Sequence, residues 1–168
     1  MKVGDESLDL VPSVFRDKRM CLAAVSVCGT QIEYVPRELV DHELCMIAVN
    51  QYGMALEHIP NDLKTYEVCF AAVKQYAWSL KYVPEHLIDQ AMCDLMMIPK
   101  NWQGLEYVPE KFKTREICIG SVLGAANALK FVPEKFITEE MCVQVAEEHG
   151  QNISFIPEHL RSYEVCLF

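Results

Sequence analysis

Residues 41–64 read DHELCMIAVNQYGMALEHIPNDLK, and residues 65–88 repeat the same pattern as TYEVCFAAVKQYAWSLKYVPEHLI. The pattern continues along the chain on both sides of these residues. A cysteine lies nine residues after each recurring proline, and successive cysteines of this series are 24 residues apart except for one step of 25. Such a fixed period predicts a repeat protein. The recurring residues are Pro12, Pro36, Pro60, Pro84, Pro109, Pro133 and Pro157, with Cys21, Cys45, Cys69, Cys93, Cys118, Cys142 and Cys166.

The first half of each repeat has the pattern of an amphipathic α-helix. It begins with Asp, Thr or Ser, whose side chains accept hydrogen bonds from the free amides of a helix start. Apolar residues follow three, four, seven and eight residues later, as in Leu44, Cys45, Ala48 and Val49, and form one helical stripe. We expect a helix of about eleven residues in each repeat. The first residues are Asp17, Asp41, Thr65, Asp89, Thr114, Thr138 and Ser162.

The second half of each repeat predicts a helical turn and then a turn that starts at the proline. Leu80 and Val83 show the spacing of a second helical face, but a proline lacks an amide and disfavours the helical conformation before it. A strand is excluded because nothing alternates with period two. Between the halves, Gly29, Gly53 and Gly150 predict a left-handed stop to the first helix.

A repeat of 24 residues cannot bury its own apolar face, whereas stacked neighbours can. We therefore predict an all-α fold, an α-solenoid of short two-helix repeats that forms a superhelix, with residues 1–168 as a single repeat domain. The first helix covers residues 17–28, and later repeats begin near 41, 65, 89, 114, 138 and 162.

The repeat at 89–113 is irregular, because Pro99 ends its helix early and an extra residue lies near Gln103 and Gly104. We expect a change of curvature there. Neither end of the chain carries an obvious polar cap of the kind that shields the terminal repeats of a solenoid. This predicts either that the chain is part of a longer protein or that its ends self-associate.

The segment YEVCFAAVKQYAWSLKYVPEHL, residues 66–87, resembles the short helical repeat catalogued as domain of unknown function 4116. The resemblance extends from about Leu8 to Phe168. It implies a helical-repeat fold, and because family members occur in bacterial and large-virus proteins, including those of host-associated bacteria, it implies a secreted bacterial effector. The motif contains no catalytic residues, so the resemblance assigns none.

The charge balance restricts the partners. The chain holds 15 Lys and Arg against 24 Asp and Glu, a formal net charge of −9, so it repels phosphate backbones and anionic lipid. We expect no nucleic-acid partner. We also expect no membrane insertion, because no apolar run approaches the roughly 18 residues that a span needs. At 51% hydrophobic and 23% charged residues, the chain is not globally disordered.

The recurring cysteines could be metal ligands, disulfides or small buried apolar side chains. Their spacing lacks the CxxC pairs of zinc sites, and equivalent positions on stacked helices are about 8–10 Å apart, too far for the roughly 7 Å of a disulfide. We therefore predict buried free thiols with no metal or cofactor, typical of a reducing cytoplasm. Cys28 lies outside this series, near a helix end, and is either a reactive thiol or, as we favour, a partly buried spectator.

A second recurring series lies seventeen residues after each repeat start, or eighteen in the repeat with the extra residue, and is aromatic except at His58. These rings could stack on bases, but the acidic charge favours packing in the core. The series is Tyr34, His58, Tyr82, Tyr107, Phe131 and Phe155.

The exceptions to the repeat predict a binding surface. Eleven and thirteen residues after the repeat start, at the end of the first helix and outside its apolar stripe, three successive repeats carry aromatic residues and methionine where other repeats are mostly polar. Tyr, Trp and Met are typical of interface hot spots. The alternative is that the rings cover the ends of the core. The residues are Tyr52, Met54, Tyr76, Trp78 and Trp102.

From these patterns we expect a non-catalytic protein–protein interaction module that binds another protein and is a bacterial effector or part of one. One alternative is the recruiting domain of a larger enzyme. A second is an enzyme with an unrecognised cysteine site around Cys28. The thiols favour a cytoplasmic location, and the resemblance adds secretion into a host cell.

Overall fold

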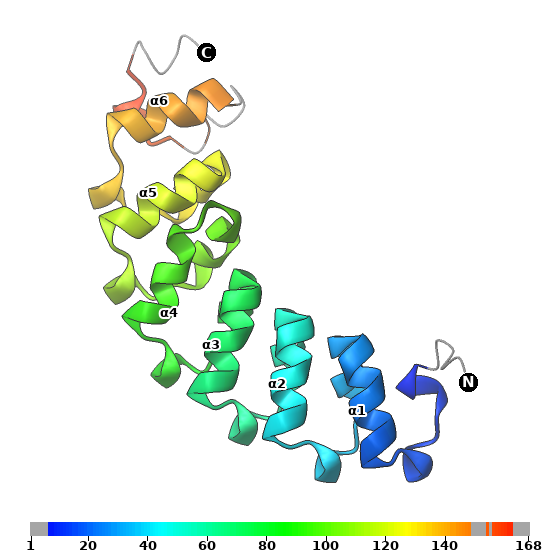
Figure 1. Ribbon diagram of the computed structural model, residues 1–168. Helices are drawn as coiled ribbons and strands as arrows, with labels where there is room; N and C mark the ends of the chain where they lie inside the picture. The colour runs from blue at the N-terminus through cyan, green and yellow to red at the C-terminus, as the bar shows by residue number, and fades with distance from the viewer. Residues whose placement is uncertain (1–6, 149–153, 155, 163–168) are drawn as a thin grey trace. The chain divides into compact units, whose positions relative to one another are not determined.

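The computed structural model of the protein describes residues 7–148, 154 and 156–162. Every regular element within these residues is an α-helix or a 3-10 helix (Figure 1), so the predicted all-α class is confirmed. The chain divides into two compact units, an N-terminal unit, Met1–Ile88, and a C-terminal unit, Asp89–Phe168. The second unit starts where the irregular repeat starts.

The N-terminal unit contains three α-helices, each followed by a six-residue and then a three-residue 3-10 helix. The predicted helical turn and proline-initiated turn are therefore both of the 3-10 type. Two further 3-10 helices, η1 (Leu8–Leu10) and η2 (Ser13–Phe15), precede them. The series is α1 (Lys18–Val27), η3 (Gly29–Tyr34), η4 (Arg37–Leu39), α2 (His42–Gln51), η5 (Gly53–His58), η6 (Asn61–Leu63), α3 (Tyr66–Gln75), η7 (Ala77–Tyr82) and η8 (Glu85–Leu87).

The C-terminal unit begins with the irregular repeat. Its α-helix has five residues where the regular ones have ten, and it ends early as predicted. The side-chain amide of Asn101 donates to the carbonyl of Leu95 at 2.8 Å and stabilises the following turn. The elements are α4 (Gln90–Asp94), η9 (Leu95–Met97), η10 (Pro99–Tyr107), η11 (Glu110–Phe112), α5 (Arg115–Gly124), η12 (Ala126–Phe131), η13 (Glu134–Phe136), α6 (Glu139–Glu148) and η15 (Glu158–Leu160).

The helix starts follow the predicted capping pattern. The Asp41 carboxylate accepts a hydrogen bond from the amide of Leu44 at 3.0 Å, and the first residue of each other repeat from Asp17 to Thr138 accepts in the same way. Each such bond satisfies one amide that a helix start would leave free. The helix that Ser162 would begin lies outside the described residues.

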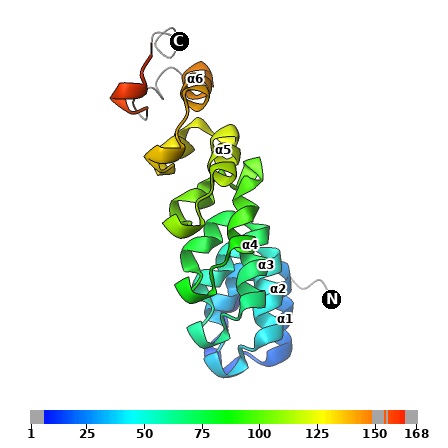
Figure 2. The ribbon, with the colours of Figure 1, turned by 90° about the vertical axis from the view of Figure 1, so that its left-hand side faces the viewer.

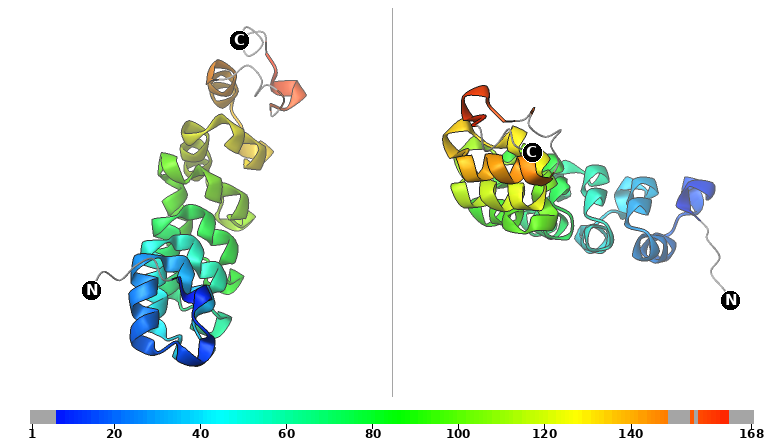
Figure 3. Two further views of the ribbon diagram at one scale, coloured as in Figure 1. Left: turned by 90° about the vertical axis from the view of Figure 1, so that its right-hand side faces the viewer. Right: turned by 90° about the horizontal axis from the view of Figure 1, so that it is seen from above.

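Neighbouring repeats of the N-terminal unit pack directly on one another. Helices α1, α2 and α3 lie side by side (Figures 1 and 3). The six-residue 3-10 helices form a second layer (Figure 2), in which η3 contacts α2 and η5 contacts α3, the α-helix of the next repeat in each case. The apolar stripe of α2, from Leu44 to Val49, faces this contact, and the side chains of Leu44, Cys45, Ala48 and Val49 are fully buried. The recurring apolar residues are therefore packing residues.

The glycines between the two halves of the repeat do not have the predicted role. No described glycine has a positive φ, and the residue that ends each α-helix of the N-terminal unit is extended. Instead, a Cβ on Gly29 or Gly53 would lie less than 3.0 Å from a carbonyl oxygen of the next α-helix, that of Ala48 or Ala72. Glycine is needed for this close approach of two backbones. Gly150 lies outside the described residues.

At every second junction between repeats, a lysine side chain joins one repeat to the next. The 24-residue period does not show this alternation. Lys64 donates to the carbonyl of Tyr82 at 3.1 Å, and Lys113 donates to that of Phe131 at 3.0 Å. The repeats between them carry an aliphatic residue at the same position, such as Val40 or Ile88. These lysine-to-carbonyl hydrogen bonds therefore recur every second repeat.

Candidate functional site

The predicted binding residues lie in both units. Tyr52, Met54, Tyr76 and Trp78 belong to the N-terminal unit, and Trp102 belongs to η10 of the C-terminal unit. Trp102 is half-buried in its own unit. We call the first four residues the aromatic surface.

Tyr76 and Trp78 form the centre of the aromatic surface. Tyr76 directly follows α3 and has an extended backbone, at φ −150°, and the buried Ala77 separates it from Trp78. The two rings are 6.4 Å apart between centroids and tilted by 58°, an arrangement that aromatic pairs favour. Trp78 remains 40% exposed while Tyr76 is half-buried. The pair thus combines an accessible indole with a fixed position.

Tyr52 occupies the equivalent position at the end of α2 and is 44% exposed, and Met54 beside it is half-buried. Gln75, the last residue of α3, connects the two helix ends. Its side-chain oxygen accepts from the amide of Gly53 at 2.6 Å, and its side-chain nitrogen donates to the carbonyl of Gln51 at 3.5 Å. These bonds hold the segment that carries Tyr52 and Met54 against the end of α3.

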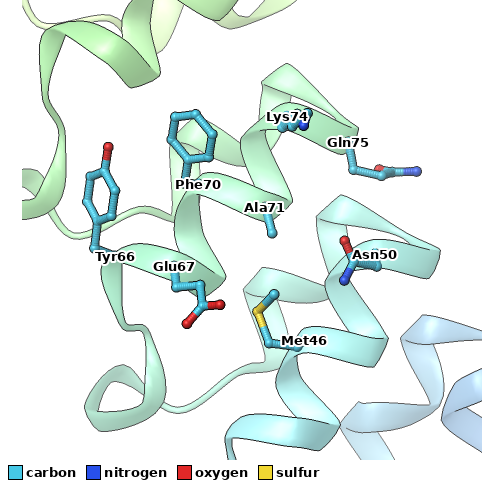
Figure 4. Close-up of a pocket in the computed structure, with 8 residues that line it drawn as sticks. All are labelled: Met46, Asn50, Tyr66, Glu67, Phe70, Ala71, Lys74 and Gln75. Atoms are coloured by element: carbon cyan, nitrogen blue, oxygen red, sulfur yellow. The ribbon is translucent and has the colours of Figure 1, made fainter.

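A groove between α2 and α3, which the sequence analysis missed, adjoins this surface (Figure 4). It has a volume of about 560 Å³. Met46 of α2 extends toward Ala71 of α3 across it. A signal for it exists in the sequence, because Met46 and Phe70 are both apolar at the same repeat position, outside the buried stripe. The lining residues are Met46, Asn50, Tyr66, Glu67, Phe70, Ala71, Lys74 and Gln75.

The groove changes character along α3. At the start of the helix, the rings of Tyr66 and Phe70 stack at 5.8 Å between centroids, with 26° between their planes. Glu67 lies beside them, with its carboxylate 3.3 Å from Nε2 of His42. Lys74 stands at the other end, one heptad further along the helix. An apolar centre thus separates an acidic end from a basic end.

The recurring cysteines are buried free thiols, as predicted, from Cys21 to Cys142. Burial raises the pKa of the Cys45, Cys69 and Cys118 thiols to about 11 and that of Cys93 to about 12. A thiol that stays protonated at neutral pH is a poor nucleophile and a poor metal ligand. Cys166 lies outside the described residues.

Cys28 corrects one prediction, because it is exposed rather than partly buried. It ends α1 with an extended backbone at φ −140°, so its side chain leaves the buried stripe of the helix. Its sulfur lies 3.1 Å from the hydroxyl of Thr30.

The aromatic series at the end of each six-residue 3-10 helix is also less buried than predicted. Tyr34, Tyr82, Tyr107 and Phe131 are half-buried, as is His58. The reason is that these residues lie at the rim of the 3-10 layer, where Lys81 lies over the ring of Tyr82 and Lys130 over that of Phe131, at 5.4 and 4.6 Å. Phe155 lies outside the described residues.

The described part of the chain has neither a grouped set of metal ligands nor a membrane-spanning helix. No three His, Cys, Asp or Glu side chains there are grouped so that they could hold a metal ion. Nor does any helix in residues 7–148, 154 and 156–162 combine the length and apolarity needed to cross a bilayer.

Comparison with known proteins identifies the segment that carries the groove and the aromatic surface. Residues 41–88 match the model of a family described as a domain of unknown function (DUF4116), so the resemblance predicted from the sequence is confirmed over these two repeats. The matched segment has the two-repeat length of the hydrogen-bond pattern described above. Searches of curated proteins and of solved structures found no match.

Proposed function

We propose that the stacked repeats form an α-solenoid of short repeats whose function is the non-catalytic binding of another protein through the aromatic surface. The observation that supports this function best is the exposure of Tyr52 and Trp78, 44% and 40%, at equivalent ends of successive helices. The recurring residues around them are buried in packing. Side chains that depart from the repeat and reach solvent are available for recognition.

The aromatic surface has the chemistry of a protein-binding hot spot. Tyr and Trp combine a large apolar area with a polar group that can form a hydrogen bond. The ring contact of Tyr76 with Trp78 and the bonds of Gln75 order the surface in advance, which reduces the entropic cost of binding. The net charge of −9 disfavours a nucleic acid. A protein segment with apolar anchors is the ligand that fits.

The two alternative functions, a recruiting domain of a larger protein and an enzyme built on Cys28, both need groups that the described site does not contain. As the recruiting domain of a larger enzyme or of a bacterial effector, the chain would use this same aromatic surface. An enzyme built on Cys28 rests on the exposure of one thiol, and the threonine hydroxyl beside it is not a general base that could activate a nucleophile. The buried free thiols support a reducing compartment, the cytoplasm of the producing cell or of a host.

Replacing both rings, Tyr76→Ala with Trp78→Ala, is expected to abolish capture of the partner, because a hot-spot aromatic contributes about 2 kcal/mol or more to binding. Helical content and melting temperature are expected to stay unchanged. The measurement is affinity capture from host and own-cell lysates, followed by titration of the captured protein against the wild type and the variant.

The control is Phe15→Ala, which removes an exposed ring of the same unit outside the aromatic surface. If the double variant binds as well as the wild type, the aromatic surface is not the binding site. If it loses its helical content instead, the rings belong to the core.

A further inference from the structure

The exposed face of α3 is self-complementary in its sequence. Residues at equal distances along the chain on either side of the midpoint between Phe70 and Ala71 have complementary side chains. Across that point the large Phe70 is matched by the small Ala71, and Glu67 is matched by Lys74. All four residues line the groove, and they lie on one side of the helix because they are spaced three, four and seven apart.

We propose that this face of α3 docks on the same face of a second copy of the chain, with the two helices antiparallel about a two-fold axis. Such an axis makes the interface isologous, so every contact forms twice. This proposal does not depend on the aromatic surface or on its partner.

The charges support the antiparallel arrangement. Glu67 and Lys74 are seven residues apart on one helix, a rise of about 10.5 Å. An antiparallel copy brings its own lysine opposite Glu67 and its own glutamate opposite Lys74, whereas a parallel copy would place like charges together. Nε2 of His42 lies 3.3 Å from the Glu67 carboxylate, so each acidic end of the contact also contains an imidazole.

The apolar centre supports close contact. A two-fold axis between Phe70 and Ala71 brings the ring of one copy onto the small side chain of the other, so that large meets small twice. Met46 forms the second wall of the groove. At the outer ends, Tyr66 of one copy comes opposite Gln75 of the other.

A helix is the form of ligand that this groove suits. Both walls are α-helices whose backbone amides are bonded internally, so an extended peptide would find few partners for its own backbone. A complementary antiparallel helix needs an acid, two apolar residues three and four positions later, and a base at the seventh. The segment from Glu67 to Lys74 has this pattern, and no other segment of the sequence does.

The test is sedimentation of the full chain over a concentration series at about 0.15 M salt, where long-range repulsion between the acidic chains is screened. We expect a reversible dimer. Glu67→Lys places lysine opposite lysine at both ends of the contact and is expected to weaken the dimer at least tenfold, because like charges in an interface are strongly unfavourable. Lys74→Glu is expected to do the same.

The double variant Glu67→Lys with Lys74→Glu restores opposite charges and is expected to recover the dimer, and the two single variants are expected to pair with each other. Glu57→Lys and Lys81→Glu are matched controls, because they make the same charge changes at exposed sites outside the groove. Circular dichroism confirms that each variant is folded.

Three outcomes would overturn the proposal. The first is a monomer at all concentrations. The second is a dimer that Glu67→Lys leaves intact, which would place the contact elsewhere, for example at the chain ends. The third is a double variant that stays monomeric like the single ones. None of these results bears on the aromatic surface, which is tested by partner binding.

Discussion

The protein is expected to lose its fold as the pH rises from about 9 to 12, because its recurring thiols are protonated when folded and ionise when unfolded. Burial raises the pKa of Cys45, Cys69 and Cys118 to about 11 and that of Cys93 to about 12, from an ordinary 9.0. A shift of two units corresponds to about 2.7 kcal/mol for each thiol. Cys45, Cys69 and Cys118 shift by this amount and Cys93 by more, so that the four thiols together are comparable to the roughly 5–15 kcal/mol that stabilises a typical domain.

The sign follows from proton binding. Below pH 9 both states keep the thiol protons, so the cysteines give no pH dependence. Above pH 9 the unfolded chain binds fewer protons than the folded one, so the free energy of unfolding falls as the pH rises through the folded pKa values. Far-ultraviolet circular dichroism should show a cooperative loss of helix within this window.

Two substitutions separate the thiols from other causes of alkaline unfolding. Cys69→Ala removes one buried ionisable group and is expected to make the pH dependence less steep. Cys28→Ser changes an exposed thiol and is expected to leave it unaltered. If the thiols ionise near pH 9 while the helical signal is retained, they are accessible to water and the packing described above is wrong.

Gly53→Ala is expected to destabilise the N-terminal unit by about 2–4 kcal/mol, the scale of a severe overpacking change. The added Cβ would lie less than 3.0 Å from the Ala72 carbonyl oxygen, 2.8 Å from Oε1 of Gln75 and 2.9 Å from Oγ of Ser79. The first of these belongs to the backbone of α3 and cannot move aside without shifting that helix.

The sign of the change in the free energy of unfolding shows which environment Gly53 occupies. Where space and conformation allow, replacing glycine with alanine stabilises a protein by about 0.4–1 kcal/mol. Urea denaturation of Gly53→Ala therefore distinguishes a close inter-repeat contact from an open turn. Glu57→Ala, an exposed change in the same 3-10 helix, is the control and is expected to stay within about 0.5 kcal/mol of the wild type. A Gly53→Ala variant as stable as the wild type would contradict the packing of η5 on α3.

The sequence predicts the packing of this protein well because packing residues recur. Leu44, Cys45 and the capping Asp41 are repeated at a fixed spacing. The requirement that stacked repeats bury a shared core explains Leu44 and Cys45, and the free amides of a helix start explain Asp41. The early end of α4 was predictable for a related reason, since a proline interrupts a pattern known from the other repeats.

The features that the sequence does not reveal depend on distances between repeats. The role of Gly53 depends on where the carbonyl of Ala72 comes to lie, and a glycine-based helix stop has the same sequence pattern. The groove needs Met46 of one helix and Phe70 of the next to lie along it, outside the buried stripe. Among the predicted binding residues, Trp102 belongs to the C-terminal unit; the sequence marks the repeat at 89–113 as irregular but does not show that a separate unit begins with it.

Because the recurring residues are buried in packing, we claim that residues outside the series are the ones available to other molecules. The most direct measurement is thiol alkylation of the native protein with each modified cysteine located by peptide mapping. We predict rapid modification of Cys28, and modification of Cys45, Cys69 and Cys93 after unfolding but not before. If Cys69 in the native protein reacts as fast as Cys28, the claim is wrong.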